Sequence, residues 1–289
     1  MASRLTLDGG IALVTGAASG IGKETVLAYA EAGAKGVVIA DINLEAAQQV
    51  AEESKKVAKH SDYKVLAVKL DIGDEKSVQG LVTETVKEFG RIDYAVNSAG
   101  IDLEGYKSFT PYLDIDLFSK SVDVNIKGAV YFVKAVTSAI AQQEPLSFTG
   151  RYGTRSLGRG SIVLVGSVQS YIGAPGMISY TTGKHAILGI MKSAAIDSLA
   201  LQSHIRVNAV CPGWVDTPMM QDGIKLNPII GHAVSTMTPL KRAATPDEVA
   251  DSIIFLSSPS ASFINGVALP IDSGLLLPPP PPLPADYIA

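Results

Sequence analysis

The chain has 289 residues, of which 47% are hydrophobic, and its 24 basic and 28 acidic side chains give a formal net charge of −4. This composition supplies enough apolar material for a sheet buried on both faces, and it is unlike that of a disordered protein. No long block of like charges points to a nucleic-acid partner, and no apolar run approaches the roughly 18 residues of a membrane span.

Short β-branched runs alternate with longer stretches of helical periodicity along the chain. The predicted strands are Ile11–Thr15, Val37–Ala40, Val65–Lys69, Tyr94–Val96, Ser161–Val165, Ile205–Val210 and Val267–Ile271. The predicted helices are Ile21–Ala32, Leu44–Lys59, Glu75–Phe89, Asp116–Gln143, Ile178–Leu201 and Pro246–Leu256. This order predicts an α/β fold, a doubly wound parallel seven-stranded sheet (Rossmann fold) with helices on both faces. Ligands are expected on the loops that follow the strands.

Residues 1–274 are expected to form a single dinucleotide-binding and catalytic domain. Glu144–Gly160 is interpreted as a long surface loop, and Leu275–Ala289 as an extended proline-rich tail that is either a mobile terminus or a docking segment. Because Ile11–Thr15 follows the start so closely, no secretory segment fits before it, and we expect a cytoplasmic protein. The single cysteine, Cys211, is interpreted as a small buried side chain, and the histidines lack metal-ligand spacing, so no metal is expected.

The first predicted strand runs into the glycine-rich turn Thr15–Gly22, which a helix follows at once. Glycines let the backbone approach a diphosphate, and a helix start offers N–H groups and a partial positive charge, although turns also need glycine for steric reasons alone. Asp41 ends the second strand about 20 residues later, where an acidic side chain can bind the adenosine ribose hydroxyls. Because NADP carries a phosphate at that ribose position, Asp41 predicts NAD(H) as the cofactor.

Tyr180 and Lys184 lie one turn apart on a predicted helix, so their side chains share a face. A neighbouring ammonium favours the phenolate and brings the tyrosine toward proton exchange near neutral pH. This spacing also occurs by chance in surface pairs. Ser167, just after the fifth predicted strand, is placed to face the same cleft.

These motifs, together with Asn97–Gly100, Asn125 and Pro212–Thr217, resemble the short-chain dehydrogenase/reductase family in its single-domain branch. The resemblance covers about Leu5 to Gly274 and is specific, because six motifs occur in the family's order. Departures from the family pattern are few: Ser98 replaces a usual asparagine, Gly166 a common serine, and both the Glu144–Gly160 loop and the tail are additions.

The resemblance implies that Tyr180 is the general acid/base, Ser167 holds the substrate oxygen, Lys184 binds the nicotinamide ribose, and Asn125 supports a proton relay. It also implies a cofactor site formed by Gly16, Ser19, Gly20, Ile21, Gly22, Asp41, Asp71, Ile72, Asn97, Ala99, Gly100, Tyr180, Lys184, Pro212, Gly213, Val215 and Thr217. Family members often form tetramers through the segment that resembles Gly266–Gly274, so we expect a homotetramer or homodimer.

By the same resemblance, residues 218–243 form a lid over the substrate, and they are rich in methionine and aliphatic side chains. This character suits an apolar small molecule with a hydrophobic ring or chain, although the same residues would equally suit the packing of a helical pair. The expected substrate-lining residues are Gln169, Tyr171, Trp214, Met219 and Met220.

The sequence thus predicts an NAD(H)-dependent enzyme that interconverts a secondary alcohol and a ketone. Two alternatives remain: a reductase of carrier-bound 3-oxoacyl chains, and a catalytically silent NAD-binding sensor or scaffold.

Overall fold

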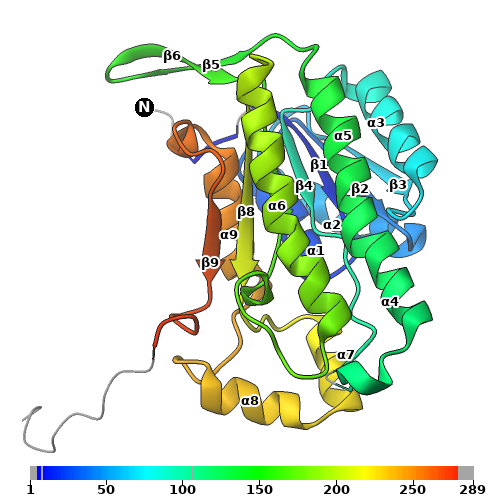
Figure 1. The fold of residues 1–289 in the computed structure, drawn as a ribbon. Coiled ribbons are helices and arrows are strands. Elements are labelled where there is room, and N and C mark those ends of the chain that lie inside the picture. The colour runs from blue at the N-terminus through cyan, green and yellow to red at the C-terminus, as the bar shows by residue number, and fades with distance from the viewer. Residues whose placement is uncertain (1–4, 8, 106, 279–289) are drawn as a thin grey trace, which may run out of the picture.

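A central parallel sheet organises the computed structural model, which describes residues 5–7, 9–105 and 107–278 (Figure 1). Its strand order is β3-β2-β1-β4-β7-β8-β9, and every neighbouring pair is parallel. The strands are β1 (Ile11–Thr15), β2 (Gly36–Asp41), β3 (Lys64–Lys69), β4 (Tyr94–Asn97), β7 (Gly160–Val165), β8 (Ile205–Pro212) and β9 (Ala268–Ile271). The order reverses between β1 and β4, and ligands of such sheets bind beyond the carboxyl ends of the strands at this point. The predicted doubly wound sheet is confirmed.

Helices cover both faces of the sheet. They are α1 (Gly20–Glu31), α2 (Leu44–Val57), α3 (Glu75–Phe89), α4 (Ile115–Val122), α5 (Gly128–Ile140), α6 (Ile178–Ala200), α7 (Pro218–Leu226), α8 (Ile229–Met237) and α9 (Pro246–Ser257). Alternate residues of β1 enter opposite cores: Val14 packs with the side chains of α1, α2 and α9, whereas Leu13 packs with those of α3, α5 and α6. Both faces are therefore apolar, as continuous hydrophobic strands require.

The single helix predicted over Asp116–Gln143 is interrupted. A π-helical turn, Asp123–Lys127, separates α4 from α5, and Asn125 lies within it. Such turns insert a residue into the helical register and frequently occur at functional sites. No break in the helical periodicity indicates this insertion.

The expectation of a structureless loop over Glu144–Gly160 is wrong. This segment forms an antiparallel hairpin of β5 (Leu146–Gly150) and β6 (Gly153–Gly158), which projects from the amino edge of the sheet (Figure 1). Gly153 has a φ of +90° and makes the reversal possible. Arg155 lies over the Phe148 ring at 5.0 Å and donates a hydrogen bond to Pro259 O, so the hairpin packs internally and against the body.

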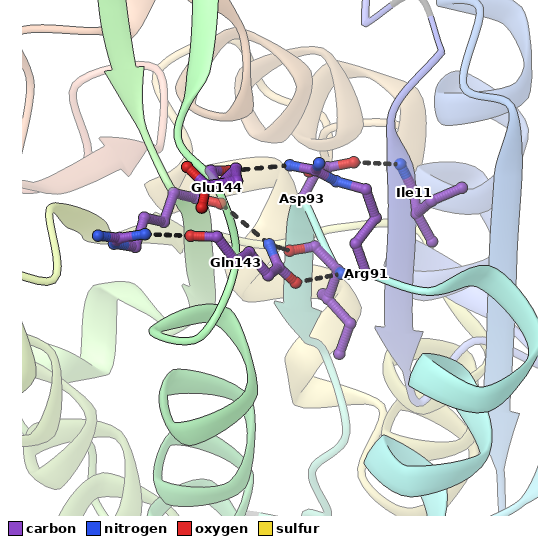
Figure 2. Close-up of polar contacts among 7 residues, drawn as sticks. Ile11, Arg91, Asp93, Gln143 and Glu144 are labelled. Atoms are coloured by element: carbon purple, nitrogen blue, oxygen red, sulfur yellow. Dashed lines mark hydrogen bonds and ion pairs between the residues drawn. The ribbon is translucent and has the colours of Figure 1, made fainter.

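Gln143 anchors the base of the hairpin, as Figure 2 shows. Its side-chain amide accepts from Ile92 N (2.7 Å) and donates to Ile92 O (2.9 Å). The Arg159 side chain donates to the backbone carbonyl of Gln143. Asp93 links the same region to β1, because it accepts from both Ile11 N and the Arg91 side chain.

Cys211 is buried on β8, as predicted. In the described part of the chain, no helix combines the length and apolar character needed to cross a membrane. Most of the proline-rich tail, from residue 279 onward, lies outside the described residues.

Candidate functional site

The glycine turn after β1 leaves an open helix start at the carboxyl edge of the sheet. A Cβ on Gly22 would lie 2.1 Å from Gly16 O, and one on Gly16 would lie 2.7 Å from the backbone of Ala99, so neither position accepts a side chain. Among the described residues, no side-chain hydrogen bond from Ser19 caps α1, and its first turn holds no acidic residue. The N–H groups and the positive end of α1 are therefore available to an anion, and this arrangement fits a dinucleotide diphosphate.

Asp41 reaches the same turn from the end of β2. One of its carboxylate oxygens accepts from Ala18 N and the other from Asn43 N, both at 3.0 Å. The carboxylate is thus fixed beside the glycine turn, where the ribose of a bound dinucleotide would lie. Lys69 on β3 is the register partner of Asp41, a neighbouring cation that reading the sequence did not identify.

The other predicted cofactor residues line the ends of neighbouring strands. Asn97 is buried and accepts from the Thr15 hydroxyl at 2.6 Å. Asp71 is exposed and accepts from Gly73 N, whereas Ile72 is buried against Gly128 at the start of α5.

The segment after β8 returns to the glycine turn from the opposite side. A Cβ on Gly20 would lie 3.1 Å from the Thr217 methyl group, so Ile21 and Thr217 belong to facing segments. Pro212 ends β8, Gly213 N donates to Ile271 O, and Val215 is buried. The structure therefore brings the two predicted cofactor segments together.

Lys184 is buried beneath Tyr180. Its ammonium lies 5.4 Å from the centre of the Tyr180 ring and donates to Val165 O at 2.9 Å. Burial lowers the pKa of Lys184 to about 8, because a charged ammonium is poorly solvated there. Tyr180 and Lys184 are thus a contacting pair at the carboxyl edge of the sheet.

Asn125 meets this pair from the π-helical turn. Its side chain accepts from Ile101 N and donates to Ile101 O, each at 2.9 Å. A Cβ on Gly100 would lie 3.2 Å from Asn125 Oδ1 and 3.7 Å from Lys184 Nζ. Gly100, Asn125 and Lys184 are therefore close together.

Ser167 begins the short helical turn after β7, where its hydroxyl accepts from Gln169 N at 3.2 Å. Ser170 ties this turn to the helix of Lys184: its hydroxyl accepts from Ser167 N and donates to Lys184 O at 2.7 Å. Reading the sequence missed Ser170, because a serine in a turn carries no signal of a contact with a distant helix.

The expected substrate residues lie in different surroundings. Gln169 is buried and accepts from the Thr181 hydroxyl at 2.6 Å. The Tyr171 hydroxyl donates a hydrogen bond to Ala268 O, so the hydroxyl is directed toward β9. Trp214 O accepts from Ala244 N, at the far end of the lid segment.

Met219 and Met220 lie on α7, which forms a helical pair with α8 beyond the carboxyl ends of the strands (Figure 1). Beside the first turn of α6, a groove of about 310 Å³ runs between Ser108–Thr110 and Gly173–Ile178.

Glu104 is a further site residue that the sequence did not reveal. Its buried carboxylate accepts from the backbone of Ser179 and Tyr180 at the start of α6. Glu104 is far from Ser179 and Tyr180 in sequence and belongs to no recognisable motif itself. Within residues 5–7, 9–105 and 107–278, no cluster of three His, Cys, Asp or Glu side chains could hold a metal ion.

The fold and the open glycine turn define a dinucleotide-binding α/β protein, and the comparisons with known proteins specify its family. The family described as "Enoyl-(Acyl carrier protein) reductase" matches residues 16–276. The "Short-chain dehydrogenase anuF" of Penicillium roqueforti is 46% identical over 269 residues, which cover 93% of this chain and 96% of that protein. The "Short-chain dehydrogenase srdC" of Neurospora crassa is 41% identical and covers 93% of this chain and 97% of its own length.

Among solved structures, levodione reductase superposes with a TM-score of 0.81 at 29% identity, covering 92% of this chain and 97% of that one. The chain belongs to the short-chain dehydrogenase/reductase family. Membership in this family makes it an oxidoreductase with a nicotinamide cofactor.

Proposed function

We propose that this protein interconverts a secondary alcohol and a ketone with NAD(H), and that Tyr180 transfers the proton. The observation that carries the proposal is the contact between the Tyr180 ring and the buried Lys184 ammonium at 5.4 Å. A cation beside a phenol favours its ionised form, so Tyr180 can exchange a proton near neutral pH.

In the reductive direction, Tyr180 donates its hydroxyl proton to the carbonyl oxygen as the carbon accepts a hydride, and the reverse steps oxidise the alcohol. The nicotinamide cofactor supplies or accepts the hydride when bound. Ser167 donates a hydrogen bond to the reacting oxygen and orients it toward Tyr180. Lys184 holds the positive charge that stabilises the phenolate, and Asn125 fixes the loop at Ile101 that closes this side of the site.

The substrate in this proposal is an apolar small molecule with a hydrophobic ring or chain. The lid helices expose several large apolar side chains, such as Met219, Leu226, Ile229 and Met237. Exposed apolar residues beside a cleft favour an apolar ligand. Levodione reductase is by its name an enzyme acting on a dione, and it shares the fold.

Asp41 supports NAD(H) within the proposal, because its carboxylate is held beside the turn where a 2′-phosphate would be repelled. A panel of cyclic and aryl ketones, each offered with NADH and with NADPH, tests the proposal by the loss of absorbance of the reduced nicotinamide. We expect turnover of at least one cyclic ketone with NADH. Tight NADH binding without turnover across the panel would instead support a silent sensor.

The similarity to the "3-oxoacyl-[acyl-carrier-protein] reductase FabG" of Thermotoga maritima, which is 33% identical over 273 residues, favours a second candidate, a reductase of carrier-bound 3-oxoacyl chains. Including a 3-oxoacyl thioester in the same panel distinguishes the two. A preference for the thioester over every cyclic ketone would replace the first candidate by the second.

For assembly, we propose a homotetramer or homodimer that forms through the long helices and β9. This strand ends the sheet and leaves one edge without a partner among the described residues. Light scattering at micromolar concentration tests the assembly, and a monomer throughout would contradict it.

A further inference from the structure

We propose that Glu104 is a positioning residue for Tyr180, and that its carboxylate fixes the first turn of α6, on which the acid/base group stands. This inference rests on the proposed function, because it assigns Glu104 a role through Tyr180.

Glu104 satisfies the N–H groups at the start of α6. One carboxylate oxygen accepts from Ser179 N at 3.1 Å and from the Ser179 hydroxyl at 2.8 Å, and the other accepts from Tyr180 N at 3.0 Å. The Glu104 residue is 5% exposed, so these bonds form away from water. A carboxylate at the positive end of a helix is stabilised by the charge-assisted bonds and by the helix dipole. The preceding residue, Met177, has no side-chain oxygen that could replace it.

The two members of the catalytic pair are held by different contacts. Lys184 is fixed by Val165 O and by the Ser170 hydroxyl, both on the segment that begins with β7. Tyr180 N is held by Glu104, which comes from the loop after β4. Loss of the Glu104 carboxylate would therefore displace the start of the helix while leaving Lys184 in place. The separation between the phenol and the ammonium would change, and a misplacement of about 1 Å can cost roughly a hundredfold in rate.

Described residues on either side of Glu104 make hydrogen bonds of their own. Asp102 accepts from Glu104 N at 2.9 Å, which fixes the loop from within. Lys107 donates to Leu226 O at 2.8 Å and so joins the loop to the end of α7 in the lid. These bonds at Asp102 and Lys107 constrain the described chain near Glu104, which suits a side chain that sets the position of another residue.

Glu104→Ala and Glu104→Gln test the inference in the full-length protein with bound NADH. Hydrogen–deuterium exchange at the Ser179 and Tyr180 amides should rise at least tenfold in the alanine variant and less in the glutamine variant, which keeps one acceptor oxygen. With the ketone that turns over fastest in the panel, kcat should fall about 10- to 100-fold for alanine, while the Kd for NADH stays within about threefold. The glutamine variant should restore part of the rate, and it remains informative if the alanine variant does not fold.

Asp74→Ala is the matched control, because Asp74 caps the start of α3 by accepting from Lys76 N, at a helix that carries no proposed site residue. It should lower Tm without changing kcat. Unchanged exchange at Ser179 and Tyr180, or raised exchange with an unchanged kcat, would overturn the role of Glu104. If no ketone is turned over by the unaltered protein, the proposed function fails, and the exchange data still show whether Glu104 holds the helix.

Discussion

Removing the Asp41 carboxylate should relax the choice between NAD(H) and NADP(H). In the folded protein the carboxylate is fixed by Ala18 N and Asn43 N, so it cannot turn away from a phosphate bound at the ribose. Lys23, a cation close to the glycine turn in sequence, is paired with Glu53 at 2.6 Å. The 2′-phosphate of NADP would therefore meet a fixed negative charge.

The size of the effect follows from Coulomb's law. Two unit charges about 5 Å apart repel by about 3 kcal/mol at an effective dielectric constant of about 20, and the second phosphate charge offsets part of the loss to solvent screening. This energy corresponds to roughly a hundredfold in binding. We expect the unaltered enzyme to prefer NADH by at least about a hundredfold in kcat/KM, and Asp41→Ala to reduce that ratio to about tenfold or less.

Lys69 provides an internal check on this reasoning. It is the register partner of Asp41 on β3 and makes no ion pair among the described residues, so in Asp41→Ala its cation can meet the phosphate. Adding Lys69→Gln should remove most of the gained NADPH activity, whereas adding Ile42→Arg, at an exposed position, should increase it. Initial rates with both cofactors measure the ratio. Equal use of NADH and NADPH by the unaltered enzyme, or an unchanged ratio in Asp41→Ala, would refute the argument.

Three further substitutions test the site. Tyr180→Phe should lower kcat by about 10²–10⁴-fold with the Kd for NADH nearly unchanged, and a rate above about a tenth of wild type would contradict proton transfer by Tyr180. Lys184→Met should raise the free energy of unfolding by about 1–3 kcal/mol at pH 7, because burial depresses the pKa of Lys184 to about 8. In urea titrations this gain in stability should fade as the pH rises from about 8 to 10.5, where the unfolded lysine also loses its proton. A gain that persists at about pH 10.5 would contradict this origin. Gly22→Ala should abolish NADH binding, measured by fluorescence, because its Cβ would collide with Gly16 O. The control Gly80→Ala, at a helical position with open space, should bind NADH normally and stabilise the protein by about 0.5–1 kcal/mol.

The elements that the sequence predicted well are those specified by local pattern. The strand around Val163 is a short apolar run between glycines, and the helix of Tyr180 is a stretch of 23 residues without a proline, a length that favours a helix over a strand. Within the turn at Gly16–Gly22, the need for Gly22 is local, because its Cβ would collide with Gly16 O, whereas Gly16 is required by the distant Ala99.

What the sequence did not reveal depends on contacts between distant segments. Glu104 and Ser170 act on α6 from other loops, and the side chains alone resemble ordinary polar loop residues. The β5–β6 hairpin was missed because its Gly- and Arg-containing sequence resembles a loop, and its packing depends on Arg155 reaching Pro259. The π-helical turn at Asn125 shifts the register by a single residue, which a periodic pattern tolerates without a visible break.

Charge at the helix ends explains why the anion site forms at the glycine turn. In a β-α repeat the helices run antiparallel to the strands, so helix starts gather at the carboxyl edge of the sheet and helix ends at the amino edge. At the amino edge, arginines meet the carbonyls that helix ends leave open: Arg206 donates to Leu256 O at the end of α9, and Arg159 donates to Gln143 O just beyond α5 (Figure 2).

At the carboxyl edge, acidic or amide side chains satisfy most of the helix starts. Asn43 caps α2, Asp74 caps α3, and Glu104 accepts from the start of α6. The start of α1 has neither a side-chain cap nor an acidic residue in its first turn. A cap there would add about 1 kcal/mol of stability but would occupy the N–H groups that a diphosphate needs. We therefore expect an anionic cofactor to bind at the start of α1, where the glycine turn and Asp41 meet.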